Sequence, residues 1–339
     1  MLSRTFFIYS PLWRENAAGI KVLYLLCHYL NSLGADAYIV PIGFGRRNHP
    51  SDLKVKYISE SWKKRKKLKK KNPIVIYSET IRGNPLSSNQ VIRYFLNYPG
   101  LLNSNVSDFF NEYALPYTHN ISESLTKLKL PNISKPLFIS SINISEIHNV
   151  SEKQNYVALY ASKYRRYVGK PNVDFVDAKV VEIFGRGRRA QNRVDTLNII
   201  ANAKSLICFE NSAIVTEAIL SRTPVFLDEN ILTKNPIASK ELGEDGVYKL
   251  AQFRDLKIDQ CVFSIAREKF LIAQSNIENE ISDFLYLVDN DQFFDVKQAC
   301  IRVKGRINRT VNHKIIFAPV LFSNLLKKYE RIVRMLCSI

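Results

Sequence analysis

Two carboxylates in the segment 204–228 have the type and spacing needed to hold a nucleotide. Glu210 follows a short apolar run, and Glu217 comes two helical turns later on about the same face. The free N–H groups at a helix N-terminus suit a pyrophosphate, and a nearby carboxylate suits the paired hydroxyls of a ribose. Two solvated acids on an ordinary crossover helix would give the same pattern, so the spacing alone leaves both interpretations open.

The same segment predicts the elements that position these acids. Residues 206–209 are too few for a helix and indicate a buried strand, whereas Asn211 and Ser212 are of the type that begins helices. Apolar residues recur at helical spacing over 214–219, and 223–227 indicates a second strand. This is the β-α-β unit of a parallel sheet, and such sheets bind ligands at the carboxyl ends of their strands. We therefore expect both acids to point into one crevice.

Cations and glycines follow two other predicted strands. Lys163 and Arg165 come directly after the strand predicted at 156–160, and Gly185 and Arg188 follow the next one. A rigid guanidinium and a mobile ammonium suit the charge of a departing phosphate, and a glycine lets the backbone approach a ligand closely. An exposed basic loop is the alternative for the first pair, and the glycine segment matches no known phosphate-binding fingerprint.

One acid stands apart in the first half of the chain. Glu79 comes just after a buried strand predicted at 74–77, and a short helix is predicted at 91–96. Its position at a strand's carboxyl end suits a general base or a ligand for an acceptor hydroxyl. A purely structural role is the alternative.

The run from Glu210 to Glu217, followed by Ala218 and by Thr223–Val225, resembles the Glu…Glu signature of GT-B glycosyltransferases. Six residues separate the acids here, whereas many retaining members have seven. The resemblance implies an α/β fold of two Rossmann-like domains that face each other across a cleft. It also implies that Glu210 contacts the donor sugar as a catalytic residue. The residues implied for the nucleotide are Lys163, Arg165, Gly185, Arg188, Asn211, Ser212 and Glu217.

The domain organisation follows from a polar stretch near the middle of the chain. We expect an acceptor-binding domain at 1–150 and a nucleotide-sugar-binding domain at 151–318, because residues 143–155 have the composition of a linker. Residues 319–339 predict an amphipathic basic helix, which would either lie on a membrane surface or cross back to the first domain.

The activity that the resemblance implies is transfer of a sugar from a nucleotide donor to a saccharide hydroxyl. Small basic members without a membrane span resemble bacterial enzymes that build O-antigen, capsule or lipopolysaccharide, whose acceptors are saccharides or lipid-linked glycans. No cofactor or metal is expected, because cations and helix N-termini would meet the phosphate charge. The alternatives are a nucleotide-sugar epimerase of the same architecture and a non-enzymatic protein that binds nucleic acid or anionic membranes.

Composition limits these classes further. The 339 residues carry a formal net charge of +18, much of it in the run Lys63–Lys71. This run is either a solvated face or a patch attracted to anionic lipid. Nucleic-acid recognition is disfavoured because no zinc-finger, RNP or GXXG motif accompanies the charge. The five cysteines and five histidines are too scattered for a metal site, and with no signal peptide or apolar run of eighteen residues we expect a cytoplasmic protein, peripheral on the membrane if at all.

Overall fold

The computed structural model describes residues 4–43, 45–58, 72–101, 109, 112–130, 133–185, 187, 189–233, 236–254 and 257–290. Residues up to Asp289 belong to one compact unit. Three predictions lie outside the described residues: the basic run Lys63–Lys71, the site residue Arg188 and the C-terminal helix 319–339.

The first half of the chain forms a five-stranded parallel sheet with the strand order β2-β1-β3-β4-β5. The strands are short apolar runs, and β3, β4 and β5 are buried along their whole length, as is usual where both faces of a parallel sheet are covered. Their bounds are β1 Thr5–Pro11, β2 Asp36–Ile42, β3 Ile74–Ser78, β4 Gln90–Phe95 and β5 Tyr113–Pro116.

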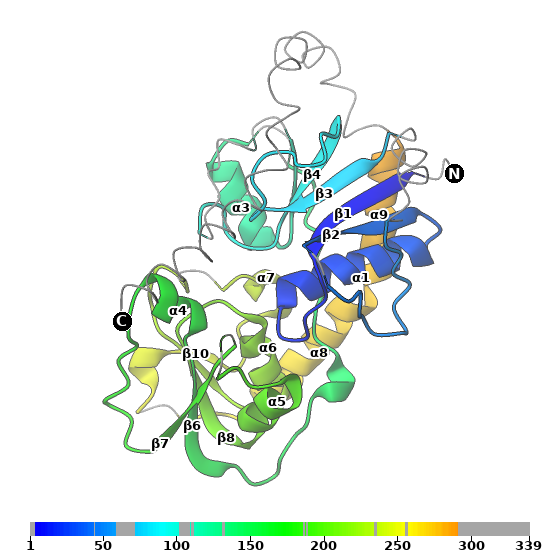
Figure 1. The fold of residues 1–339 in the computed structure, drawn as a ribbon. Helices are drawn as coiled ribbons and strands as arrows, with labels where there is room; N and C mark the ends of the chain where they lie inside the picture. Colours follow the sequence, from blue (N-terminus) through cyan, green and yellow to red (C-terminus); the bar gives the residue numbers. More distant parts are fainter. Residues whose placement is uncertain are drawn as a thin grey trace, which may run out of the picture. The chain divides into compact units, whose positions relative to one another are not determined.

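Three of the described helices accompany this sheet. Helix α1 (Ala18–Ser32) buries an apolar stripe that includes Leu23 and Leu26, and α3 (His119–Lys127) begins at Thr118, whose hydroxyl accepts the Ile121 N–H. Helix α9 (Ile277–Asp289), near the end of the described chain, returns to the first sheet, and its Phe284 ring lies 6.2 Å from Phe6 of β1. Figure 1 shows α1 and α9 next to this sheet.

The second half of the described chain forms another five-stranded parallel sheet, with the order β10-β9-β8-β6-β7. Its core combines strand residues such as Ala158 and Leu206 with Ile214 and Ala218 of the crossover helix. The strands are β6 Gln154–Tyr160, β7 Lys179–Ile183, β8 Ala203–Cys208, β9 Val225–Leu227 and β10 Val247–Lys249. The helices are α4 Ser162–Tyr167, α5 Arg193–Asn202, α6 Ala213–Leu220, α7 Ser239–Leu242 and α8 Cys261–Ser275.

Contacts between α3 and the α7 region join the two halves. The Asn120 side chain donates to the Pro236 carbonyl and to the Ser239 hydroxyl, both at 2.7 Å. The carboxylate of Glu241 accepts the backbone N–H of His119, also at 2.7 Å. The segment 236–242 is thereby fixed against the first sheet and its helices.

The predicted succession of strand, helix and strand around Glu210 is confirmed as β8, α6 and β9. The helix predicted at 91–96 is wrong, because these residues form the buried strand β4. The boundary predicted at residue 150 stays a prediction. Among the described helices, none combines the length and the apolar character needed to cross a membrane.

Candidate active site

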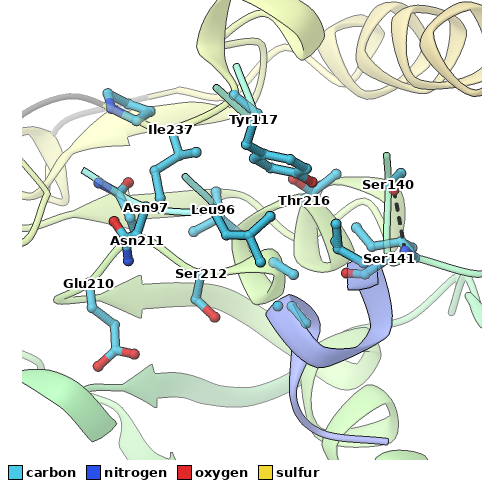
Figure 2. A pocket seen from close by; sticks show the side chains of 18 of the residues that line it. Leu96, Asn97, Tyr117, Ser140, Ser141, Glu210, Asn211, Ser212, Thr216 and Ile237 are labelled. Atoms are coloured by element: carbon cyan, nitrogen blue, oxygen red, sulfur yellow. Dashed lines mark hydrogen bonds between the residues drawn. The ribbon is translucent and has the colours of Figure 1, made fainter. Parts of the chain in front are cut away.

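A cavity of about 630 Å³ opens at the carboxyl ends of strands from both sheets. This volume lies within the range of small-molecule sites, and loops at this edge are where α/β sheets bind ligands. Part of its polar lining comes from residues that closely follow strands. These include Ser78 and Glu79 after β3, Asn97 after β4, Lys163 after β6, Gly185 after β7, and Glu210, Asn211 and Ser212 after β8. Figure 2 shows several of them around the cavity.

Glu79 has the environment of a general base. Its side chain is 3% exposed, and one carboxylate oxygen accepts the Leu96 backbone N–H at 3.0 Å. Burial raises the pKa of Glu79 to about 7, and the hydrogen bond from Leu96 opposes this only in part. A carboxyl group that titrates near neutrality and lines a cavity can take up and release a proton under physiological conditions.

Glu210 lies at the cavity, but its carboxylate already has partners. It is fully buried and accepts the backbone N–H groups of Lys163 and Tyr164, the latter at 3.2 Å. These contacts tie the carboxyl end of β8 to the start of α4. The contacts favour a positioning role, and the catalytic role against a donor sugar stays a prediction.

Of the predicted cations after β6, the structure brings one to the cavity. The Lys163 ammonium lies 3.8 Å from the Glu210 carboxylate and donates to the Asn211 carbonyl at 2.9 Å. Arg165 instead pairs with Glu182 of β7 through two bonds of 2.5 and 2.8 Å and does not line the cavity. Arg166 does line it, because positions 163 and 166 share one face of helix α4. The separation of three residues between Lys163 and Arg166 was the feature of the sequence that could have identified Arg166.

Glu217 does not line the same cavity as Glu210 but lies in a smaller one that adjoins it, and the expectation that both acids serve one crevice stays a prediction. Its carboxylate accepts a 2.5 Å hydrogen bond from Arg193 of α5, whose Nε lies 3.1 Å from Glu146. Glu217 lines this smaller cavity of about 60 Å³, and the two cavities share seven lining residues, among them Tyr160, Gly185 and Ser212. The two acids line different cavities because α6 begins at Ala213, so Glu210 precedes the helix and helical spacing does not relate it to Glu217.

Replacing Glu217 by alanine should reduce stability, because it removes the closest partner of the largely buried Arg193. We expect the free energy of unfolding to fall by about 1–3 kcal/mol. Glu217→Gln keeps an acceptor for the guanidinium and should cost less. Urea denaturation followed by circular dichroism measures both variants, and an alanine variant as stable as the wild type would show that Glu146 alone satisfies Arg193.

Gly185, Asn211 and Ser212 all line the large cavity. A Cβ on Gly185 would lie 2.9 Å from the Tyr160 hydroxyl, so this position needs a glycine for close packing. Ser212 is the N-cap residue of α6, and its side chain makes no capping bond but hydrogen-bonds with Tyr160, so the first N–H groups of the helix are left at the cavity. No described group of three His, Cys, Asp or Glu residues has an arrangement that could hold a metal.

Three residues of this site were not among the predicted site residues. Arg166 is one, and the others are Asn97 and Tyr117, which follow β4 and β5 and line the first-sheet side of the cavity. The prediction of a helix at 91–96 hid Asn97, because a residue after a helix does not lie at a strand end.

Comparison with known proteins yields structural similarity only. No family model and no curated protein matches the sequence. Sucrose-phosphate synthase from Thermosynechococcus elongatus matches with a TM-score of 0.54 and 8% identity, over 85% of this chain and 99% of the other. Similarity is lower for T4 phage BGT in complex with UDP and Mn2+ (TM-score 0.49, 9% identity, 84% and 99% covered). The lipopolysaccharide outer core galactosyltransferase WaaB, apo form, also gives 0.49 (12% identity, 83% and 99% covered).

The match to sucrose-phosphate synthase and the two parallel sheets establish the fold class. The chain has the GT-B fold, with two Rossmann-like halves, as the resemblance around Glu210 and Glu217 predicted. At such low identity the similarity concerns the fold alone.

Proposed function

We propose that the protein is a glycosyltransferase that moves a sugar from a nucleotide-activated donor to a saccharide hydroxyl. One observation carries the proposal: a single cavity brings together Glu79 from the first sheet with Lys163 and the start of α6 from the second. The Glu79 carboxylate can take the proton of an acceptor hydroxyl, and Lys163 and the N-terminus of α6 can bind a phosphate. The setting in bacterial surface polysaccharide or lipopolysaccharide synthesis rests on the sequence resemblance.

In this proposal the second half of the chain holds the donor. The diphosphate would lie at the N-terminus of α6, with Lys163 and Arg166 meeting its charge. Arg193 binds only one carboxylate oxygen of Glu217, which leaves the other oxygen for a ribose hydroxyl. Glu210 would act by holding Lys163 in place.

The first half would hold the acceptor, with Glu79 as the base. As the acceptor oxygen bonds to the anomeric carbon, Glu79 would take the hydroxyl proton, and the bond from the anomeric carbon to the donor phosphate would break. The nucleoside diphosphate would leave with the bonding electrons, and the cations and helix N–H groups would stabilise its developing charge. Protein groups alone supply this stabilisation, so the proposal requires no metal.

A panel of nucleotide sugars tests the donor half of the proposal. Incubation with UDP-, GDP-, CDP- and ADP-linked sugars, each with and without EDTA, should give protection against thermal unfolding by at least one donor, unchanged by the chelator. Release of the nucleoside diphosphate should require an acceptor, which separates a transferase from an epimerase. Absence of protection by every donor would contradict the proposal, and loss of protection with EDTA would contradict its metal independence.

Two neighbouring cations provide a matched pair of variants. We expect Lys163→Ala to weaken binding of the protective nucleotide about tenfold or more, because a charge-assisted hydrogen bond to phosphate is lost. Arg165→Ala should bind as the wild type does, because Arg165 is paired with Glu182 outside the cavity. Titration calorimetry measures both affinities. Equal losses in the two variants would show that net charge, and not the placement of Lys163, controls binding.

A further inference from the structure

The first-sheet side of the cavity carries a group of neutral side chains that the donor does not use. They combine apolar and hydrogen-bonding groups and come mainly from the ends of β4 and β5 and from the chain beyond β5, whereas one of them, Thr216, belongs to α6 of the second half. Figure 2 shows these residues around the same space: Leu96, Asn97, Tyr117, Ser141 and Thr216.

Tyr117 offers a fixed aromatic surface. Its hydroxyl donates to the Ile139 carbonyl at 3.1 Å, and its ring contacts Tyr94 edge-on and Phe138 at a tilt, with centroids 6.2 and 5.0 Å away. Because these contacts fix the ring, the part that lines the cavity keeps one orientation. The electron-rich face of an aromatic ring attracts polarised C–H groups, such as those on one face of a pyranose.

Asn97 has an unused donor beside this ring. The residue is 5% exposed, and its side-chain oxygen accepts the Tyr98 N–H at 2.8 Å. Within the described part of the chain, no group accepts a hydrogen bond from its amide nitrogen. Buried amide N–H groups normally have a hydrogen-bond acceptor. Because this one lines a cavity and has none, the hydroxyl oxygen of a ligand can accept its hydrogen bond.

Backbone hydrogen bonds place the amide and the ring next to the proposed base. The Leu96 N–H binds the Glu79 carboxylate at 3.0 Å, and Asn97 is the next residue. The Tyr117 N–H donates to the Phe95 carbonyl at 3.0 Å, so the ends of β4 and β5 are adjacent. Ring, amide and base therefore belong to three neighbouring strand ends.

We propose that these residues form a subsite for a pyranose ring of the acceptor, a step that rests on the proposed function. The apolar face of the sugar lies on Tyr117 and against Leu96, and its hydroxyls bind Asn97. One hydroxyl then points to Glu79, which takes its proton. An aromatic ring with neutral hydrogen-bonding groups suits a neutral sugar, because none of these five side chains carries a positive charge that would pair with a phosphate or carboxylate.

Direct binding of simple sugars tests the subsite. The probes are methyl glycosides of glucose, galactose, mannose and N-acetylglucosamine, measured by saturation-transfer NMR with and without a nucleoside diphosphate. We expect at least one to bind the wild type, and Asn97→Ala and Tyr117→Leu to weaken it about tenfold or more. Tyr117→Phe keeps the ring and should bind as the wild type does. Thermal unfolding checks that each variant is folded. If Tyr117→Leu does not fold, the affinity of Asn97→Ala alone tests the subsite.

The outcomes separate this inference from the proposed function. If no methyl glycoside binds, or if Asn97→Ala binds as the wild type does, the subsite is overturned even where nucleotide sugars protect the protein. If methyl glycosides bind through Asn97 and Tyr117 while no nucleotide sugar binds, the subsite stands and the glycosyltransferase proposal fails.

Discussion

Glu79→Gln should lower kcat for sugar transfer by about 10²–10⁴-fold while leaving the affinity for the donor unchanged. This is the usual effect of removing a general base. The glutamine oxygen can still accept the Leu96 N–H, so the loop keeps its geometry and only the capacity to take up a proton is lost. Initial rates at saturating donor and acceptor, together with donor affinity from calorimetry, measure the two effects separately.

The pH dependence of the same variant identifies the group further. Because burial raises the pKa of Glu79 to about 7, the wild-type rate should rise with pH through that value and then level, whereas the residual rate of Glu79→Gln should lack this step. Stability should move in the opposite direction. Between the ordinary value of 4.5 and about 7 the folded protein holds a proton that the unfolded chain releases, so the wild type loses about 3 kcal/mol as pH rises through this range. The glutamine variant should lack that loss.

Another acid of the cavity serves as the control. Glu244 also lines the cavity, and Glu244→Gln should keep the wild-type rate and pH profile. A Glu79→Gln variant with wild-type kcat would remove Glu79 from the chemistry, whatever its pKa.

The edge of the second sheet was predictable because parallel sheets bring their strand ends together. Short apolar runs followed by Lys163, Gly185 and Glu210 predicted that these residues would meet, and they do line one cavity. The residue at which each helix begins, and therefore the direction in which each of its side chains points, could not be predicted to within one position. Glu210 lies before α6 begins, and successive positions of α4 face different ways, so Arg165 pairs with Glu182 while Arg166 lines the cavity.

The error at residues 91–96 has a different cause. A run of six residues with Val91, Ile92, Tyr94 and Phe95 fits a buried strand and a short helix equally well by periodicity. The deciding feature is Arg93, a charged residue that is fully buried in β4. The groups that bind the Arg93 guanidinium are distant in the sequence. No local pattern therefore showed that a buried strand at this position could contain a charged residue.

Those partners make Arg93 the position where we expect the largest loss of stability. The guanidinium donates to both carboxylate oxygens of Glu112 at 2.7 and 2.9 Å and to the Ile81 and Gly83 carbonyls at 2.6 and 2.9 Å. The Tyr77 ring centroid lies 4.9 Å from its central carbon. Arg93→Ala leaves Glu112 and these carbonyls without their donor, and we expect the free energy of unfolding to fall by about 3–5 kcal/mol. Urea denaturation followed by circular dichroism measures the change.

Two further variants show whether the loss comes from the unpaired groups or from the missing volume. Arg93→Lys keeps the charge but has one nitrogen, which cannot bind Glu112 and both carbonyls together, so it should lose most of the same stability. The double variant Arg93→Met with Glu112→Leu removes both charges and should recover part of the lost stability, because the isolated carboxylate is gone.

The carbonyls that Arg93 binds belong to the loop that starts at Glu79, so Arg93→Lys should also lower kcat more than donor affinity. Wild-type stability in Arg93→Ala would mean that the loop after β3 is held by packing alone.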